Sequence, residues 1–189
     1  MIKFKKSNVM NKKLSFIIFL VVFSITTSSS QFAKTNKVRI IPDSAVIQLW
    51  GDLTCNILFN PSKVNCYILN PTARPEGNSK IIGGFVVDRS IGNIANTYYP
   101  VLQFLLADVE NYQTDSTSIS KCPFTPYLAF EFTKNKEKVY LLVAYNCKSW
   151  GIVHKGIIRH VEYNCHQQLI RFSRGILPYD NYISVISKH

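Results

Sequence analysis

Residues 122–147 read CPFTPYLAFEFTKNKEKVYLLVAYNC, two apolar runs joined by a charged segment and bounded by a cysteine at each end. Alternation of apolar and polar side chains with a period of two is typical of a half-buried β-strand. With the turn centred on Asn135-Lys136, three apolar pairs lie opposite each other: Phe132 and Val139, Phe130 and Leu141, Leu128 and Val143. The stretch therefore predicts an antiparallel hairpin. Its first strand begins after Pro126, because proline cannot donate to a ladder.

A second hairpin is expected around Asn60-Pro61-Ser62-Lys63, where Asn and Pro suit the first two positions of a type I turn. Strands of about 53–59 and 64–69 would flank this turn with the same period of two. Residues 81–87 are expected to form one further strand with a glycine bulge at Gly83-Gly84. Residues 70–80 (NPTARPEGNSK) read as a long surface loop.

Two segments have helical patterns. Asn96 or Thr97 would cap a helix that runs to about Asp108, with Pro100 tolerated in its first turn. A second helix is expected over about 163–174, followed by Gly175 as the left-handed residue that ends it. Strands and separate helices predict an α+β fold: one domain with an antiparallel sheet of hairpins and two packed helices.

The N-terminus has the three parts of a secretory signal peptide. Five lysines precede the apolar segment 16–25 (FIIFLVVFSI), and Ser28 and Ser30 suit a cut before Gln31. As a helix the apolar segment would span about 15 Å, against about 30 Å of membrane hydrocarbon. We therefore expect residues 1–30 to be removed and 31–189 to form an exported domain with no stable membrane span, in the periplasm, at the cell surface or outside the cell.

The charge of the chain does not indicate nucleic-acid binding. The whole sequence carries +11, but five of its 22 Lys and Arg residues belong to the expected leader, which leaves 17 against 11 acidic residues over 31–189, or +6. The surplus is scattered, whereas nucleic-acid binding needs a basic stripe. Solvated lysines on a small soluble domain explain the pattern better.

Five cysteines in an exported chain allow two disulfides and one remaining thiol. We expect Cys55–Cys66 and Cys122–Cys147, because each pair brackets one predicted hairpin; the alternative is that they are buried thiols. In the predicted registers both pairs sit two residues from direct opposition. Diagonal neighbours lie about 7–8 Å apart, whereas a disulfide needs Cα atoms about 5.5–6 Å apart. A bulge or a different turn length must close that gap.

The fifth cysteine, Cys165, lies on the apolar side of the second predicted helix and is expected to be a core thiol. The alternative is a nucleophile or metal ligand near His166, His160 and His154. Adjacent helical residues point in different directions, so Cys165 and His166 would not share a site. The sequence contains neither C-x-x-C nor H-E-x-x-H, and no G-x-S-x-G or phosphate loop. We assign no catalytic residue, no metal site and no cofactor.

One resemblance accompanies the first hairpin. Cys122-x-Phe124-x-Pro126, the hairpin, and then Cys147 and Trp150 resemble a pattern in small, uncharacterised exported bacterial proteins, over about residues 98–178. The resemblance implies export but no particular activity. Many of those proteins carry a second cysteine at the position that Tyr145 occupies here.

The sequence thus predicts an exported binding or structural module stabilised by disulfides, without catalytic activity. An alternative is a secreted or periplasmic enzyme whose site combines Cys147 and His154. A third possibility is an interaction surface built from tyrosines, namely Tyr98, Tyr99, Tyr179 and Tyr182.

Overall fold

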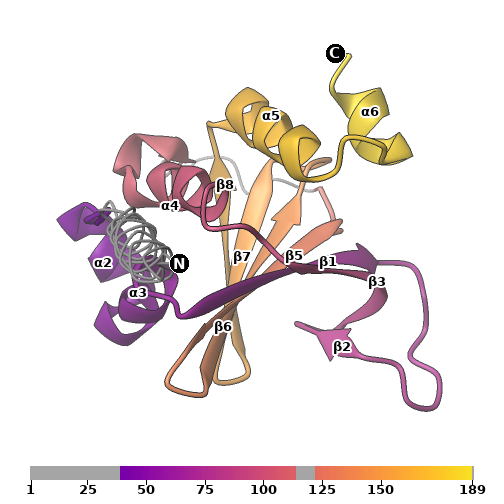
Figure 1. Cartoon of the computed structure of the whole chain (residues 1–189), viewed down its shortest axis with the longest axis horizontal. Coiled ribbons are helices and arrows are strands. Elements are labelled where there is room, and N and C mark those ends of the chain that lie inside the picture. The colour runs from indigo at the N-terminus through magenta and orange to yellow at the C-terminus, as the bar shows by residue number, and fades with distance from the viewer. Residues whose placement is uncertain (1–38, 114–121, 189) are drawn as a thin grey trace, which may run out of the picture. The chain divides into compact units, whose positions relative to one another are not determined.

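The computed structural model describes residues 39–113 and 122–188; the expected leader lies outside these ranges. The described residues form five α-helices and eight strands (Figure 1). The helices are α2 (Ser44–Trp50), α3 (Asp52–Phe59), α4 (Tyr99–Ala107), α5 (His166–Ile176) and α6 (Asn181–Ile186). The strands are β1 (Lys63–Asn70), β2 (Ile81–Ile82), β3 (Phe85–Asn93), β4 (Tyr112–Gln113), β5 (Leu128–Lys134), β6 (Glu137–Ala144), β7 (Ser149–His154) and β8 (Ile157–Tyr163).

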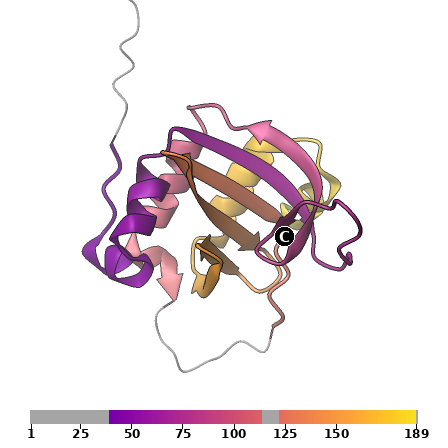
Figure 2. The same ribbon diagram turned by 90° about the horizontal axis from the view of Figure 1, so that it is seen from below.

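All eight strands belong to one antiparallel sheet, in the order β2-β3-β1-β5-β6-β7-β8-β4. The sheet is strongly curved (Figure 2). The pairing of β1 with β3 shifts register twice, after Cys66 and after Ile68, and such irregularities bend a sheet. The α+β class and the antiparallel sheet are confirmed. The expectation of two helices is wrong, since the described residues contain five.

The main core lies between the sheet and the helices. All five helices contribute buried apolar side chains to it, and they meet one face of β1, β5, β6 and β7. The central strands supply fully buried residues such as Phe130, Leu141 and Trp150. The helices therefore lie on a single face of the sheet; in Figure 1, α2 and α3 are to the left of the strands and α5 and α6 are above them.

The hairpin of β5 and β6 follows the predicted register. Leu128 pairs with Val143, Phe130 with Leu141 and Phe132 with Val139. The turn residues Asn135 and Lys136 both have positive φ, 49° and 68°, as a two-residue hairpin turn requires. The prediction succeeds because register, turn and apolar face are all specified within one short stretch of sequence.

The predicted strand over residues 53–59 is wrong, because this segment forms α3. Thr54 and Leu58 are both buried and lie four residues apart, as residues on one side of a helix do. Cys55, next to Thr54, is buried as well. A short apolar run does not distinguish the two periods. Gly51, with φ of 84°, separates α2 from α3, and only the second half of the predicted hairpin is present, as β1.

The segment 81–87 also forms a structure other than the predicted one. Instead of one strand with a bulge, it forms a hairpin of β2 and β3 around Gly83 and Gly84, with φ of 58° and 88°. A Cβ on Gly83 would lie 2.7 Å from Leu142 Cδ1 and 3.0 Å from Val153 Cγ2. The turn therefore packs directly on the second face of the sheet.

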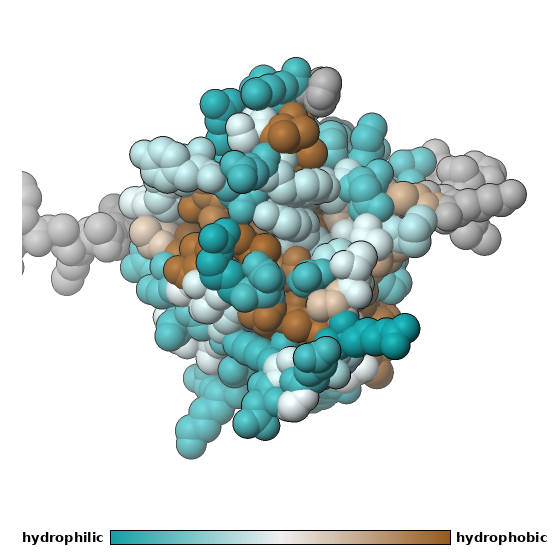
Figure 3. Space-filling view, turned by 90° about the vertical axis from the view of Figure 1, so that its right-hand side faces the viewer, coloured by the Kyte–Doolittle hydropathy of each residue, from teal (hydrophilic) through white to brown (hydrophobic). Residues whose placement is uncertain are grey.

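This second face carries a smaller apolar cluster, which includes Leu69, Leu142 and Val153. The turn of β2 and β3 and the side chain of Phe124 cover this cluster. The ring centroid of Phe124 lies 4.3 Å from that of His160 and 6.1 Å from that of Phe85. Figure 3 shows apolar surface, surrounded by hydrophilic residues, on the side of the molecule where β2 and β3 lie. The cover of the second face is thus thin, and it depends on the segment that follows Cys122.

The two predicted helices are present with shifted ends. The first, α4, begins at Tyr99 with Pro100 in its first turn, as expected. The second, α5, begins three residues later than predicted and contains Gly175, because its last hydrogen bond is made by Leu177. No helix among the described residues is both long enough and apolar enough to cross a membrane.

Candidate functional site

The thiols of Cys122 and Cys147 lie within hydrogen-bonding reach of each other, where the chain enters β5 and leaves β6. Burial and the hydrogen bond with Cys147 raise the pKa of the Cys122 thiol. The side-chain amide of Asn146 donates to Cys122 Sγ at 3.5 Å and to the Pro123 carbonyl at 3.3 Å. Both cysteines lie outside the paired residues of β5 and β6, so the two-residue offset of the predicted ladder does not separate them.

The structure gives no support to the predicted disulfide between Cys55 and Cys66, because the hairpin that they would bracket is not formed. Cys55 lies on α3, where its thiol contacts the Val46 carbonyl at 3.8 Å, and Cys66 lies on β1. Burial raises the pKa of Cys55 to about 11 and that of Cys66 to about 12. Both side chains are therefore protonated at neutral pH and behave as small core residues. All five cysteines carry thiols in this structure.

Cys165 is a core thiol, as predicted. It lies at the start of α5 with 1% of its surface exposed, and burial raises its pKa to about 12. Within residues 39–113 and 122–188, no group of three or more His, Cys, Asp or Glu side chains is arranged to hold a metal ion.

Cys147 and His154 do not share a site. Cys147 precedes β7, and His154 is the last residue of this strand. The strand alone separates its two ends by roughly 17 Å, since an extended chain rises about 3.3 Å per residue. The predicted pairing of Cys147 with His154 in an active site is therefore wrong.

The four tyrosines considered as an interaction surface have different environments. Tyr179 is 96% exposed and Tyr98 is 42% exposed, whereas Tyr99 is buried. Tyr182 is half-buried, with its ring 4.3 Å from that of Tyr127. These residues do not form one exposed patch.

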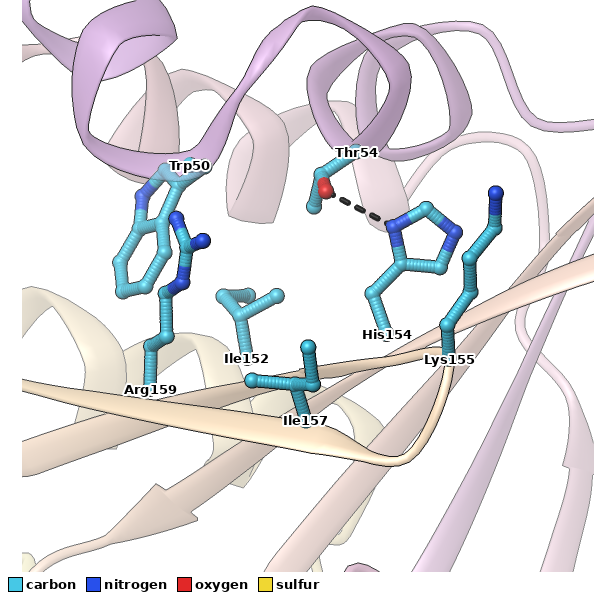
Figure 4. A pocket seen from close by; sticks show the side chains of 7 residues that line it. All are labelled: Trp50, Thr54, Ile152, His154, Lys155, Ile157 and Arg159. Atoms are coloured by element: carbon cyan, nitrogen blue, oxygen red, sulfur yellow. Dashed lines mark hydrogen bonds between the residues drawn. The ribbon is translucent and has the colours of Figure 1, made fainter.

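A small pocket lies between the α2–α3 pair and the hairpin of β7 and β8, and sequence reasoning did not find it. It encloses about 140 Å³ and is lined by seven residues: Trp50, Thr54, Ile152, His154, Lys155, Ile157 and Arg159. We call it the His154 pocket. Figure 4 shows the two helices above it and the hairpin below it, with Trp50 and Arg159 at one end and His154 and Lys155 at the other.

Trp50 forms a rigid wall of the His154 pocket. Its indole N–H donates to the Tyr112 hydroxyl at 3.1 Å, and that hydroxyl donates to the Leu106 carbonyl at 2.7 Å. The ring of Tyr112 also packs against Trp150, with centroids 5.0 Å apart. A buried chain of aromatic contacts and hydrogen bonds therefore fixes the indole.

Thr54 and His154 are joined across the pocket. The Thr54 hydroxyl and His154 Nδ1 lie 2.9 Å apart and are hydrogen-bonded (Figure 4). Burial and the neighbouring Lys155 lower the pKa of His154, against a smaller opposite effect of Glu137. The imidazole is therefore neutral at neutral pH. Its other nitrogen, Nε2, is buried and has no hydrogen-bond partner among the described residues.

Two cations border the His154 pocket. Arg159 donates to the Leu49 carbonyl at 3.1 Å, so one of its five N–H groups is in use. Lys155 takes part in neither of the two ion pairs that the described residues form. None of the seven lining residues is acidic. The pocket therefore combines positive charge with an apolar floor.

The two carboxylates that are buried elsewhere have structural partners. Asp180 accepts from the Tyr127 hydroxyl at 2.8 Å and from the backbone N–H of Ile183 at 3.0 Å, which caps α6. Glu131 accepts from Asn65 and from Lys138, each at 3.0 Å. Because these carboxylates are fully engaged, they do not suggest an acid–base site.

A scan against protein-family models, a search of curated proteins and a search of solved structures each found no match to this chain.

Proposed function

We propose that this chain is an exported binding or structural module without catalytic activity, held together by a disulfide between Cys122 and Cys147. The observation that carries the proposal is the proximity of the two thiols: Asn146, the neighbour of Cys147, donates to Cys122 Sγ at 3.5 Å, and Cys147 contributes to the raised pKa of Cys122. Neighbouring thiols become oxidised in the compartments that a signal peptide leads to. The resemblance to small exported bacterial proteins with the same cysteine pattern agrees with this proposal.

The positions of Cys122 and Cys147 indicate which part of the fold a disulfide would stabilise. Cys122 precedes Phe124, which covers the second face of the sheet over Gly151 and His160. A bond to Cys147 would tie this covering segment to the end of β6. In the chain-entropy model a loop of this size stabilises the fold by about 3 kcal/mol.

The enzyme alternative has less support. Cys147 and His154 are at opposite ends of β7, and burial keeps Cys55, Cys66 and Cys165 protonated. The remaining polar pair in a pocket is Thr54 with His154, and neither is accompanied by a carboxylate that would orient the imidazole. Binding at the His154 pocket is therefore the better-supported activity.

The proposal is tested by labelling the unreduced protein with a thiol probe, first folded and then unfolded in urea. We expect Cys122 and Cys147 to stay unlabelled in both states and to react after reduction. The Cys122→Ser variant is the control, because it leaves Cys147 as a thiol that reacts once the chain is unfolded. Labelling of Cys147 in the unreduced wild-type protein would show that the disulfide is absent.

A further inference from the structure

Helix α4 is apolar on the side that faces solvent as well as on the side that faces the core. Its sequence, YPVLQFLLA, contains no charged residue. Its single amide side chain, Gln103, points inward: it is 3% exposed and donates to the Leu58 carbonyl at 2.6 Å. Val101 and Phe104 are 48% and 64% exposed. A surface helix normally presents charged or polar residues to solvent, so the outer side of α4 has the composition of a contact surface.

Three apolar side chains follow one another along this outer side. Tyr98, which is 42% exposed, has a helical backbone conformation and directly precedes α4. Residues three apart are neighbours on the surface of a helix, so Tyr98 lies next to Val101, and Val101 lies next to Phe104. We call these three residues the α4 stripe. Single exposed apolar residues are ordinary, whereas a contiguous row of them marks an interaction site.

Helices α4 and α5 lie side by side and run in opposite directions (Figure 1). A Cβ on Gly175, near the end of α5, would lie 3.5 Å from Tyr98 Cε1 at the start of α4. Beyond the other end of α4, the backbone N–H of Asn164 donates to the Asn111 carbonyl at 3.0 Å, just before α5 begins. The start of α4 is therefore beside the end of α5, and the end of α4 is beside the start of α5.

The two ends of the α4 stripe carry opposite charges. Arg174 precedes Gly175 and is exposed beside the N-terminal end of α4. Glu110 follows the C-terminal end of α4 and is also exposed. Neither takes part in the two ion pairs that the described residues form. The nine residues of α4 separate the two ends by about 14 Å. The surface is thus cationic at one end, apolar in the middle and anionic at the other end.

We infer that the α4 stripe is the contact surface of a homodimer, in which its occupant is a second copy of this chain. In a two-fold symmetric contact one surface meets its own copy. With the two α4 helices antiparallel, Phe104 of each protomer packs against Val101 of the partner subunit, and Arg174 lies near Glu110 of the partner subunit. An anionic membrane would attract the Arg174 end and repel the Glu110 end, so the charges favour the second copy. The inference goes beyond the proposed function and needs no disulfide.

The test is analytical ultracentrifugation of the oxidised mature protein over a range of concentrations. We expect a reversible equilibrium of monomer and dimer with a dissociation constant of about 10–100 μM, because a contact built on one short helix lies at the low end of interface size. A protein that stays monomeric at about 1 mM would overturn the inference.

A matched pair of apolar substitutions localises the contact. Phe104→Ser should weaken dimerisation at least about tenfold, because it removes the most exposed apolar side chain of the stripe. Val185→Ser is the control: Val185 is 56% exposed, and its helix α6 lies on the other side of α5 from α4 (Figure 1). Urea unfolding of both variants checks that they are folded. Equal effects of the two substitutions on dimerisation would contradict a contact at the α4 stripe.

Exchanging the charges tests the two-fold arrangement. Arg174→Glu and Glu110→Arg should each weaken dimerisation about tenfold, since each places like charges together twice in the symmetric contact. The double variant restores both pairs with reversed sign and should dimerise nearly as well as the wild type. If the double variant is as weak as the single variants, Arg174 and Glu110 do not meet across the contact and the antiparallel dimer is wrong.

Vesicles made of anionic phosphatidylglycerol distinguish a lipid surface from a second copy. If the protein stays monomeric and binds these vesicles, and Phe104→Ser abolishes that binding, the α4 stripe is a membrane-contact surface and the dimer inference is wrong. Either result leaves the proposed disulfide untouched, because peptide mapping of Cys122 and Cys147 tests it separately.

Discussion

The contact between Thr54 and His154 joins residues 100 positions apart in the sequence, at 2.9 Å. Thr54 is 6% exposed, so its hydroxyl depends on this partner in place of water. A buried polar group that loses its partner costs about 1–3 kcal/mol. This single hydrogen bond therefore connects α3 to the end of β7 and shapes the His154 pocket.

We expect Thr54→Val to lower the free energy of unfolding by about 1–2 kcal/mol, because the imidazole then has no partner at Nδ1. Thr54→Ser keeps the hydroxyl and loses one methyl group, which costs about 0.8 kcal/mol. Urea unfolding of both variants checks the order. If Ser is more destabilising than Val, side-chain volume matters at this position and the hydrogen bond does not.

Three histidines predict how stability depends on pH. Burial lowers the pKa of His154, His160 and His166 in the folded protein, and the nearby Lys155 and Lys148 lower those of His154 and His166 further. The unfolded chain, with histidine pKa values of about 6.5, therefore binds protons more readily. Stability is complete above about pH 6.5 and falls as the pH drops below it.

Urea unfolding at about pH 7.5 and about pH 5.5 measures this loss of stability. His160→Gln should reduce the pH dependence, because it removes one imidazole whose pKa is lowered where its ring packs against Phe124. If the free energy of unfolding were the same at both pH values, or larger at the lower one, the three imidazoles would not be desolvated.

At the scale of elements, the turn between β2 and β3 connects one edge of the sheet to its second face. Gly83→Ala should destabilise the fold by about 2–4 kcal/mol, because a Cβ at φ of 58° would be strained and would lie 2.7 Å from Leu142 Cδ1. Gly84→Ala is the matched control: φ is 88°, but its Cβ would meet no atom within 4 Å. We expect it to cost about 1 kcal/mol. Equal losses in thermal or urea unfolding would mean that the turn does not pack on Leu142.

The elements that the sequence predicts are those specified locally. The hairpin of β5 and β6 has its turn residues next to its apolar pattern, and helix α4 has Pro100 in its first turn, although its N-cap is Tyr98 and not the predicted Asn96 or Thr97. Residues 53–59 were misassigned because their apolar positions fit both periods, and the long-range packing of Cys55 and Leu58 into the core selects the helix. The strands β7 and β8 were not predicted at all.

The His154 pocket could not be predicted for a similar reason. Its residues come from α2, α3, β7 and β8, and no spacing within the sequence places Trp50 beside Arg159. The cysteine pair was accessible to prediction, because Cys122 and Cys147 bracket one hairpin. A disulfide between them stays a prediction. The expected ladder positions of both residues are wrong, because the chain leaves the ladder before it reaches either.

At the scale of the whole molecule, the two faces of the sheet are protected unequally. Five helices cover the first face, and the second face depends on Phe124 and on the turn at Gly83. A disulfide at Cys122 would anchor the thinner cover. This arrangement suits a domain that has to persist outside the cell, where thiols are oxidised and chaperones are scarce.

The most direct test of the exported, disulfide-held module is peptide mapping, without reduction, of the protein recovered outside the cytoplasm. We predict a mature N-terminus near Gln31, without the segment 16–25, and a linked peptide that contains Cys122 and Cys147. A protein that retains residues 16–25, or in which these two cysteines are found in unlinked peptides, would contradict it.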